Sequence, residues 1–93
     1  MEYVILSPCT TAKSRELRMR GKIDLAKAEE SLSKDHDITG RTEVFLAFAY
    51  KGKPVTLYSS GKIVVKEAES EEAKALLKEV LALLEGRGCL VEN

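Results

Sequence analysis

The residues Thr56-Leu57-Tyr58-Ser59-Ser60-Gly61-Lys62-Ile63-Val64-Val65 predict two short strands joined by a tight turn. Apolar and β-branched residues flank a Ser-Ser-Gly sequence, and serine and glycine are common in turns. An amphipathic helix is expected from Ser70-Glu71-Glu72-Ala73 onward, because acidic residues favour the first turn of a helix. Its apolar face would consist of Ala73, Leu76, Leu77, Val80, Leu81 and Leu84.

Upstream of this stretch we expect a strand, a helix and a third strand. Residues 3–6 form a short apolar run, and Asp24 is a plausible N-cap for a helix over residues 25–33. Residues 44–50 are continuously apolar and precede a hairpin turn at residues 51–54. The short connections predict an antiparallel meander whose strands cover residues 44–50, 55–58 and 62–66.

Two segments have weaker patterns. Residues 10–21 are polar and basic, which suggests a loop or a short irregular helix, and residues 89–91 could add a terminal strand. The predicted class is therefore α+β, with the order β-α-β-β-β-α and an optional last strand. We expect residues 1–93 to form a single domain in which two helices cover one face of a curved antiparallel sheet.

Composition limits the classes of function. The chain has 93 residues with 44% hydrophobic and 32% charged content, enough for one compact core. Fifteen basic and fifteen acidic residues give a net charge of zero, so any attraction to nucleic acid must be local. No apolar run reaches the roughly 20 residues of a membrane span, and no secretory leader is recognisable. We expect a cytoplasmic protein without membrane association.

Other residue types add little chemistry. Cys9 and Cys89 lack CxxC spacing, so we interpret both as free thiols, although the sequence leaves a disulfide open. Glutamine is absent and asparagine occurs only at Asn93, while Glu and Lys are plentiful, a bias associated with thermophilic hosts.

The order of elements, with Lys22-Ile23-Asp24-Leu25 before the first helix and Ser60-Gly61-Lys62 in the hairpin, resembles one repeat of the TATA-box-binding protein family. The resemblance covers roughly residues 23–84. It implies a half-saddle fold whose open sheet face meets nucleic acid. The family stacks two such repeats in one chain, and this chain has room for one, so a partner is implied.

The resemblance assigns roles to several residues. Tyr58 matches a phenylalanine that wedges between base steps, and Thr42 falls at the other wedge, where the apolar side chain is lost. Arg41 matches a basic position near the phosphates. Strand positions that would face DNA are matched by Lys62, Val64 and Lys66, with Thr56 beside them. Recognition specific for a TATA sequence is therefore not expected.

Alternation along residues 44–50 gives both faces of that strand an apolar character, because Leu46 and Phe48 alternate with Phe45 and Ala47. The helices can cover only one face of the sheet. In the family's arrangement the uncovered face would display the apolar set Phe48, Tyr50, Tyr58 and Val64. Such a patch favours a second hypothesis, in which the face is buried in a homodimer or against a protein partner.

The basic segment over residues 13–22 also has two interpretations. Its cations, Arg15, Arg18 and Arg20 among them, could contact phosphates, or they could belong to a solvated loop. Aromatic residues among the strand lysines are compatible with stacking on single-stranded bases and equally with packing.

Catalysis is the least favoured class. Cys9 with His36 is the only conceivable nucleophile and base, and no spacing supports the pair. Asp35-His36-Asp37 lacks the ligand spacing of a calcium loop, and the phosphate-loop pattern GxxxxGK[ST] is absent. We expect no enzyme activity, no metal and no cofactor. The leading expectation is a binding module for DNA or RNA without sequence specificity, and the alternative is a homodimerisation or protein-interaction domain.

Overall fold

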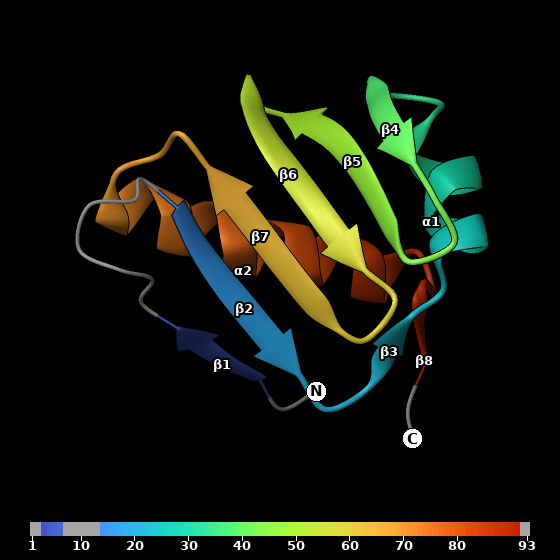
Figure 1. Ribbon diagram of the computed structural model, residues 1–93, viewed down its shortest axis with the longest axis horizontal. Coiled ribbons are helices and arrows are strands. Elements are labelled where there is room, and N and C mark those ends of the chain that lie inside the picture. The colour runs from blue at the N-terminus through green and yellow to red at the C-terminus, as the bar shows by residue number, and fades with distance from the viewer. Residues whose placement is uncertain (1–2, 7–13, 92–93) are drawn as a thin grey trace.

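The computed structural model describes residues 3–6 and 14–91. It has an α+β architecture with a six-stranded antiparallel sheet in the order β1-β2-β7-β6-β5-β4 (Figure 1). The strands of this sheet are β1 (Tyr3–Leu6), β2 (Ser14–Met19), β4 (Ile38–Arg41), β5 (Phe45–Tyr50), β6 (Lys53–Tyr58) and β7 (Lys62–Lys66). A separate pair consists of β3 (Lys22–Ile23) and β8 (Leu90–Val91). The helices are α1 (Leu25–Leu32) and α2 (Ser70–Gly86).

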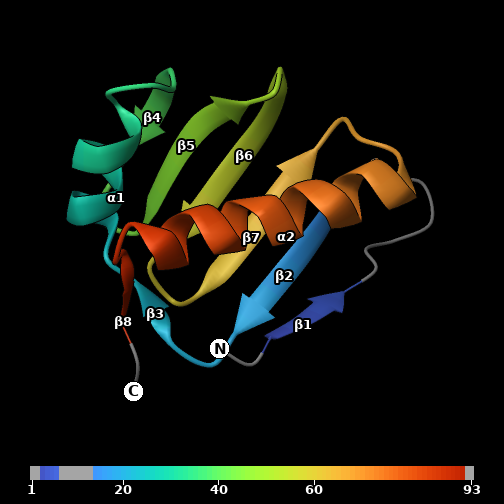
Figure 2. The same cartoon turned by 180° about the vertical axis from the view of Figure 1, so that it is seen from behind.

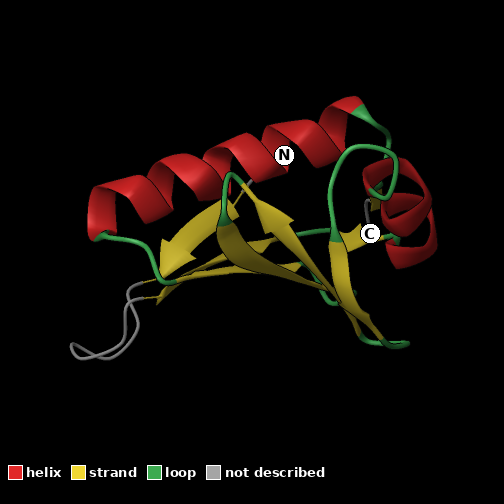
Figure 3. Cartoon of the chain, turned by 90° about the horizontal axis from the view of Figure 1, so that it is seen from above, coloured by secondary structure: helices red, strands yellow, loops and turns green. Residues whose placement is uncertain are grey.

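Both helices lie on the same side of the sheet. The long helix α2 crosses the strands obliquely, in front of them in the view of Figure 2, and packs against β2 and β7, while α1 contacts β5 at the other end (Figure 3). The side chains between these layers form one core, and the fully buried ones include Leu17 from β2, Ile63 from β7 and Leu77 from α2. Neither described helix lies on the opposite face of the sheet.

The predicted meander is confirmed and is one strand longer than expected. The turn between β5 and β6 is a two-residue turn, with Lys51 at φ 52° and Gly52 at φ 79°. Positive φ at both central residues is typical of the hairpin turn whose twist matches that of the strands. The added strand is β4, which pairs with β5 through an irregular register between Ile38 and Gly40.

The expectation of a loop or helix over residues 10–21 is wrong for its described part. Strand β2 inserts between β1 and β7, and Leu17 lies opposite Ile63 in the ladder. The segment alternates, because Leu17 and Met19 are buried while Arg18 is exposed. This period of two is the mark of a half-buried strand. Two apolar residues among so many charges gave a weak signal.

The helix ends follow the sequence closely. Asp24 caps α1, since its carboxylate accepts a hydrogen bond of 3.1 Å from the backbone N–H of Lys27. The carboxylate of Asp35 just after α1 accepts two hydrogen bonds from Arg87 just after α2, at 2.7 and 3.1 Å. This contact ties the two helix ends together. The optional terminal strand is present as β8 and pairs with β3 outside the main sheet.

The turn between β6 and β7 packs against the chain that leaves β2. Gly61 has a φ of 100°, and its carbonyl accepts a hydrogen bond of 2.9 Å from the backbone N–H of Met19. The carbonyl of Ser59 accepts another from Ile23 at 3.2 Å. An added Cβ at Gly61 would lie 2.2 Å from the carbonyl oxygen of Gly21, so only glycine fits here.

Candidate nucleic-acid interface

The polar residues of β7 mark the open face of the sheet. Ile63 and Val65 are fully buried beneath α2, so the alternating Lys62, Val64 and Lys66 face away from the helices. The registers of the ladder extend this face to the neighbouring strands. We define the open face as the described residues on this side, namely Val4, Glu16, Arg18, Gly40, Phe45, Ala47, Ala49, Pro54, Thr56, Tyr58, Lys62, Val64 and Lys66.

One row across the open face combines two cations with two aromatic rings. Arg18 of β2 lies opposite Lys62 of β7, Lys62 lies opposite Tyr58 of β6, and Tyr58 lies opposite Phe45 of β5. Side chains directly opposite each other on antiparallel strands touch. We call these four residues the basic-aromatic row.

Distances within the row show how its members contact each other. The ammonium of Lys62 lies 4.4 Å from the centroid of the Tyr58 ring, which is a cation–π contact. The centroids of Tyr58 and Phe45 are 6.2 Å apart and the ring planes are inclined at 54°. The rings therefore do not stack face to face on each other.

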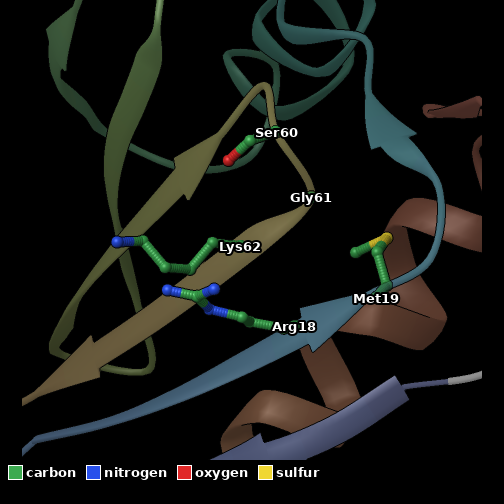
Figure 4. Close-up of a pocket in the computed structure, with 5 residues that line it drawn as sticks. All are labelled: Arg18, Met19, Ser60, Gly61 and Lys62. Carbon is green, nitrogen blue, oxygen red and sulfur yellow. The ribbon is translucent and has the colours of Figure 1, made fainter.

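A pocket of about 250 Å³ lies at the cationic end of the row and is lined by Arg18, Met19, Ser60, Gly61 and Lys62. Figure 4 shows the side chains of Arg18 and Lys62 next to each other, with the Ser60 side chain at the turn beyond them. The side chain of Arg18 is 61% exposed, and its Nε donates a hydrogen bond of 3.1 Å to Glu16. Two cations and a hydroxyl around one hollow suit an anion such as a phosphate.

The centre of the open face is small and less charged. Val64 lies opposite Glu16 on one side and Thr56 on the other, and Thr56 lies opposite Ala47. Over the whole open face Arg18, Lys62 and Lys66 supply three positive charges against the single negative charge of Glu16. The face is thus locally basic although the chain is neutral.

The predicted placement of Phe48 and Tyr50 on the open face is wrong. Phe48 is 1% exposed and belongs to the core under the helices. Tyr50 lies on the same side, where its hydroxyl contacts Glu79 of α2 at 3.3 Å, and burial together with that carboxylate raises the pKa of Tyr50. The alternation was correct, but the face was assigned in reverse. Tyr58 and Val64 do lie on the open face.

Two of the predicted phosphate contacts also point the other way. Arg41 lies opposite the buried Leu46, and its Nε is 3.6 Å from a carboxylate oxygen of Glu29 on α1. Arg15 lies opposite the buried Val65 and so shares the helix side of the sheet. Of the remaining predicted cations, Arg18 faces the open side and Arg20 is exposed beyond the end of β2.

The side chain of Thr42, at the second wedge position, forms hydrogen bonds within its own turn. Its hydroxyl accepts hydrogen bonds of 3.2 Å from the backbone N–H groups of Val44 and Phe45. This side chain is therefore an anchor for the loop between β4 and β5. Lys13 and Cys9, which belong to the predicted basic segment and thiols, lie outside the described residues.

Phe45 is the site residue that the sequence interpretation missed. A signal for it was present, because any even-length turn over residues 51–54 gives Tyr58 a partner at an odd-numbered position of β5. Phe45, Ala47 and Ala49 are those positions. The face of Tyr58 therefore had to include Phe45 and exclude Phe48.

Away from the open face, the described chain contains one cysteine, Cys89, and one histidine, His36. Cys89 is buried and its thiol is free, and burial raises the pKa of that thiol. His36 packs against Phe48 and Tyr50, with ring centroids 5.8 and 5.4 Å away. Within residues 3–6 and 14–91, no three His, Cys, Asp or Glu side chains are grouped so that they could hold a metal ion. Neither described helix is both long and apolar enough to cross a membrane.

Comparisons with known proteins returned no relatives. No protein-family model, no curated protein and no solved structure matched the chain. The geometry of the open face is therefore the ground on which a function can be proposed.

Proposed function

We propose that this protein is a non-enzymatic module that binds nucleic acid through the open face of its sheet. The observation that carries the proposal is the basic-aromatic row, in which Arg18 and Lys62 lie beside Tyr58 and Phe45. Cations supply the sequence-independent affinity for phosphates, and aromatic rings offer surfaces for bases. The residues that the structure describes include neither asparagine nor glutamine, whose amide groups can read base edges, so we propose binding without sequence specificity.

The proposal retains a fold like one repeat of the TATA-box-binding family. It is supported by the order of elements from β2 onward: strand β2, the two-residue strand β3, α1, a meander and α2, with both helices on one side. Tyr58, Lys62, Val64 and Lys66 lie on the open face, as the resemblance implies. Arg41 and Thr42 depart from it, so we do not extend the family's kinking of duplex DNA to this protein.

A salt series of fluorescence-anisotropy titrations tests the proposal. We expect binding to labelled nucleic acid at low salt, with log K falling linearly against log salt concentration, because each neutralised phosphate releases counterions. Reversing two charges with Arg18→Glu plus Lys62→Glu should abolish most of this affinity. It should also reduce the slope by about 1.4 to 1.8, since each phosphate contact contributes about 0.7 on single strands and 0.9 on duplexes.

The matched control reverses two exposed lysines away from the open face, Lys34 after α1 and Lys78 on α2. This double variant changes the net charge by the same amount and should bind much as the unaltered protein does. Equal losses in both double variants would show that only global charge matters. Absence of binding at low salt to single-stranded, duplex and structured nucleic acid would refute the proposal.

A homodimer or protein partner on the same face is the second candidate, and an exposed valine favours it. Val4 on β1 is 57% exposed and lies opposite Arg18 at one end of the row. With Phe48 and Tyr50 in the core, such an interface would use Phe45, Tyr58 and Val64. Light scattering over a concentration series measures it: a dimer that Val4→Lys dissociates, together with no nucleic-acid binding, would favour this candidate.

A further inference from the structure

We infer that the open face takes single-stranded nucleic acid, with bases on Tyr58 and Phe45 and a phosphate between Arg18 and Lys62. This inference rests on the proposed function and names its ligand. The type of nucleic acid follows from the arrangement of the basic-aromatic row, because the row can contact only those bases and phosphates that a ligand leaves accessible.

The ring geometry favours unpaired bases. The centroids of Tyr58 and Phe45 are 6.2 Å apart, whereas successive bases along a stacked strand are separated by about 3.4 Å. The two rings therefore suit neighbouring bases that have been spread apart. Bases within a duplex are covered by their neighbours on both sides, while the faces of unpaired bases are free to stack on aromatic side chains.

Lys62 connects the two halves of this binding mode. Its ammonium lies over the Tyr58 ring at 4.4 Å, and Lys62 is also one of the residues that line the pocket with Arg18 and Ser60. An exposed cation–π contact is weaker than the stacking of a base on a ring. When a base stacks on Tyr58 in place of the ammonium, the Lys62 side chain becomes free to contact a phosphate of the same strand. The phosphate then bridges Lys62 and Arg18 in the pocket that the free protein already has.

The charge of the open face points the same way. Three cations and one carboxylate leave it modestly basic, with Arg18 also hydrogen-bonded to Glu16. Duplex DNA carries one charge per about 1.7 Å of its axis, and a single strand carries one per about 3.4 Å. Moderate positive charge combined with exposed rings matches the sparser charge and free bases of a single strand.

The test compares matched ligands and matched ring variants by anisotropy. The ligands are oligothymidylate, oligouridylate and a blunt duplex of the same length. Tyr58→Leu and Phe45→Leu keep apolar volume and remove a ring, and each should weaken single-strand binding by about 5-fold to 150-fold, the worth of one stacked base. Tyr58→Phe keeps the ring and should bind within about two-fold of the unaltered protein, since stacking does not need the hydroxyl.

Intrinsic fluorescence supplies a second readout. The chain has three tyrosines and no tryptophan, so a base stacked on Tyr58 should quench tyrosine emission. Tyr58→Phe should therefore keep its affinity and lose that part of the quench, which a merely structural role of Tyr58 would not produce. Circular dichroism of every variant confirms that the fold is retained.

The outcomes separate this inference from the proposed function. Tight binding of either single strand with weak binding of the duplex supports the inference. Duplex binding as tight as single-strand binding, or affinity unchanged in both leucine variants, overturns the inference and leaves the proposed function standing. If neither these three ligands nor a structured nucleic acid binds at low salt, both are overturned.

Discussion

Replacing Gly61 by alanine should destabilise the protein far more than the same change at Gly52. Both glycines have positive φ, at 100° and 79°, so both substitutions force alanine into a conformation that L residues rarely adopt. They differ in their surroundings. The new Cβ at Gly61 would lie 2.2 Å from the carbonyl oxygen of Gly21 and 3.2 Å from the carbonyl oxygen of Met19, while no atom lies within 4 Å of one at Gly52.

The magnitudes follow from these distances. The backbone term is about 1–2 kcal/mol at either position. At Gly61 the carbonyl of Gly21 must also move by roughly an ångström, which disturbs the hydrogen bond from the Met19 N–H to the Gly61 carbonyl and adds about 0.5–1.5 kcal/mol. Repacking of the nearby Met19 side chain adds to this. We expect a loss of about 2–4 kcal/mol for Gly61→Ala and about 1–2 kcal/mol for Gly52→Ala.

Urea denaturation followed by far-ultraviolet circular dichroism measures the free energy of unfolding of each variant. A domain of this size has a total of roughly 5–14 kcal/mol, so Gly61→Ala should remain folded with a clearly lower midpoint. Gly86→Ala is the internal control, because Gly86 ends α2 without positive φ and without neighbours within 4 Å, and it should be neutral or stabilising by up to about 1 kcal/mol. A difference below about 0.5 kcal/mol between Gly61→Ala and Gly52→Ala would refute the steric reasoning.

Two further predictions concern ionisable groups. The hydrogen bonds from Arg87 hold the pKa of Asp35 below its usual range, so the unfolded chain binds this proton more readily than the folded one. The pair therefore contributes stability above the unfolded pKa of about 4 and loses it as the pH falls, and the stability difference between the unaltered protein and Asp35→Asn should shrink between pH 7 and pH 3; a constant difference would contradict this. Burial raises the pKa of Cys89, so in a Cys9→Ser background alkylation by iodoacetamide should be slow in buffer and fast in denaturing urea, whereas rapid labelling of the native protein would show that the thiol is accessible.

The meander and the helices were accessible from sequence because each carries a strong local signal. Residues 62–66 match β7 exactly, and Asp24 marks the start of α1 as a capping residue should. Strand β2 was missed because Leu17 and Met19 are its only large apolar residues, and pairing with two neighbours makes that segment a strand. Its position in the sheet depends on contacts far along the chain.

The candidate site was predicted in part for a related reason. Tyr58 and Lys62 were placed correctly, since the turn between them fixes their common face. Phe45 and Phe48 lie on opposite faces of β5, and the composition of β5 alone does not show which of these faces the helices cover. Only the pairing of β5 with β6, whose Val55 and Leu57 are buried, selects Phe48 for the core. The buried face of β5 is thus set by its neighbour β6 and cannot be assigned from the residues of β5 alone.

The insertion of β2 beside β7 has a consequence for how the protein folds. The four strands of the meander and α2 are consecutive in the chain. Strand β2 is far from its partner β7 in the sequence, since Leu17 pairs with Ile63. Contacts between segments that are distant in the chain cost more conformational entropy to form. We therefore expect the N-terminal hairpin, β1 with β2, to dock late in folding and to detach first in local unfolding. Arg18 comes from that hairpin and Lys62 from the meander. A ligand that contacts both cations would bind only the form in which the N-terminal hairpin is docked. Its binding would therefore stabilise the docked hairpin against detachment.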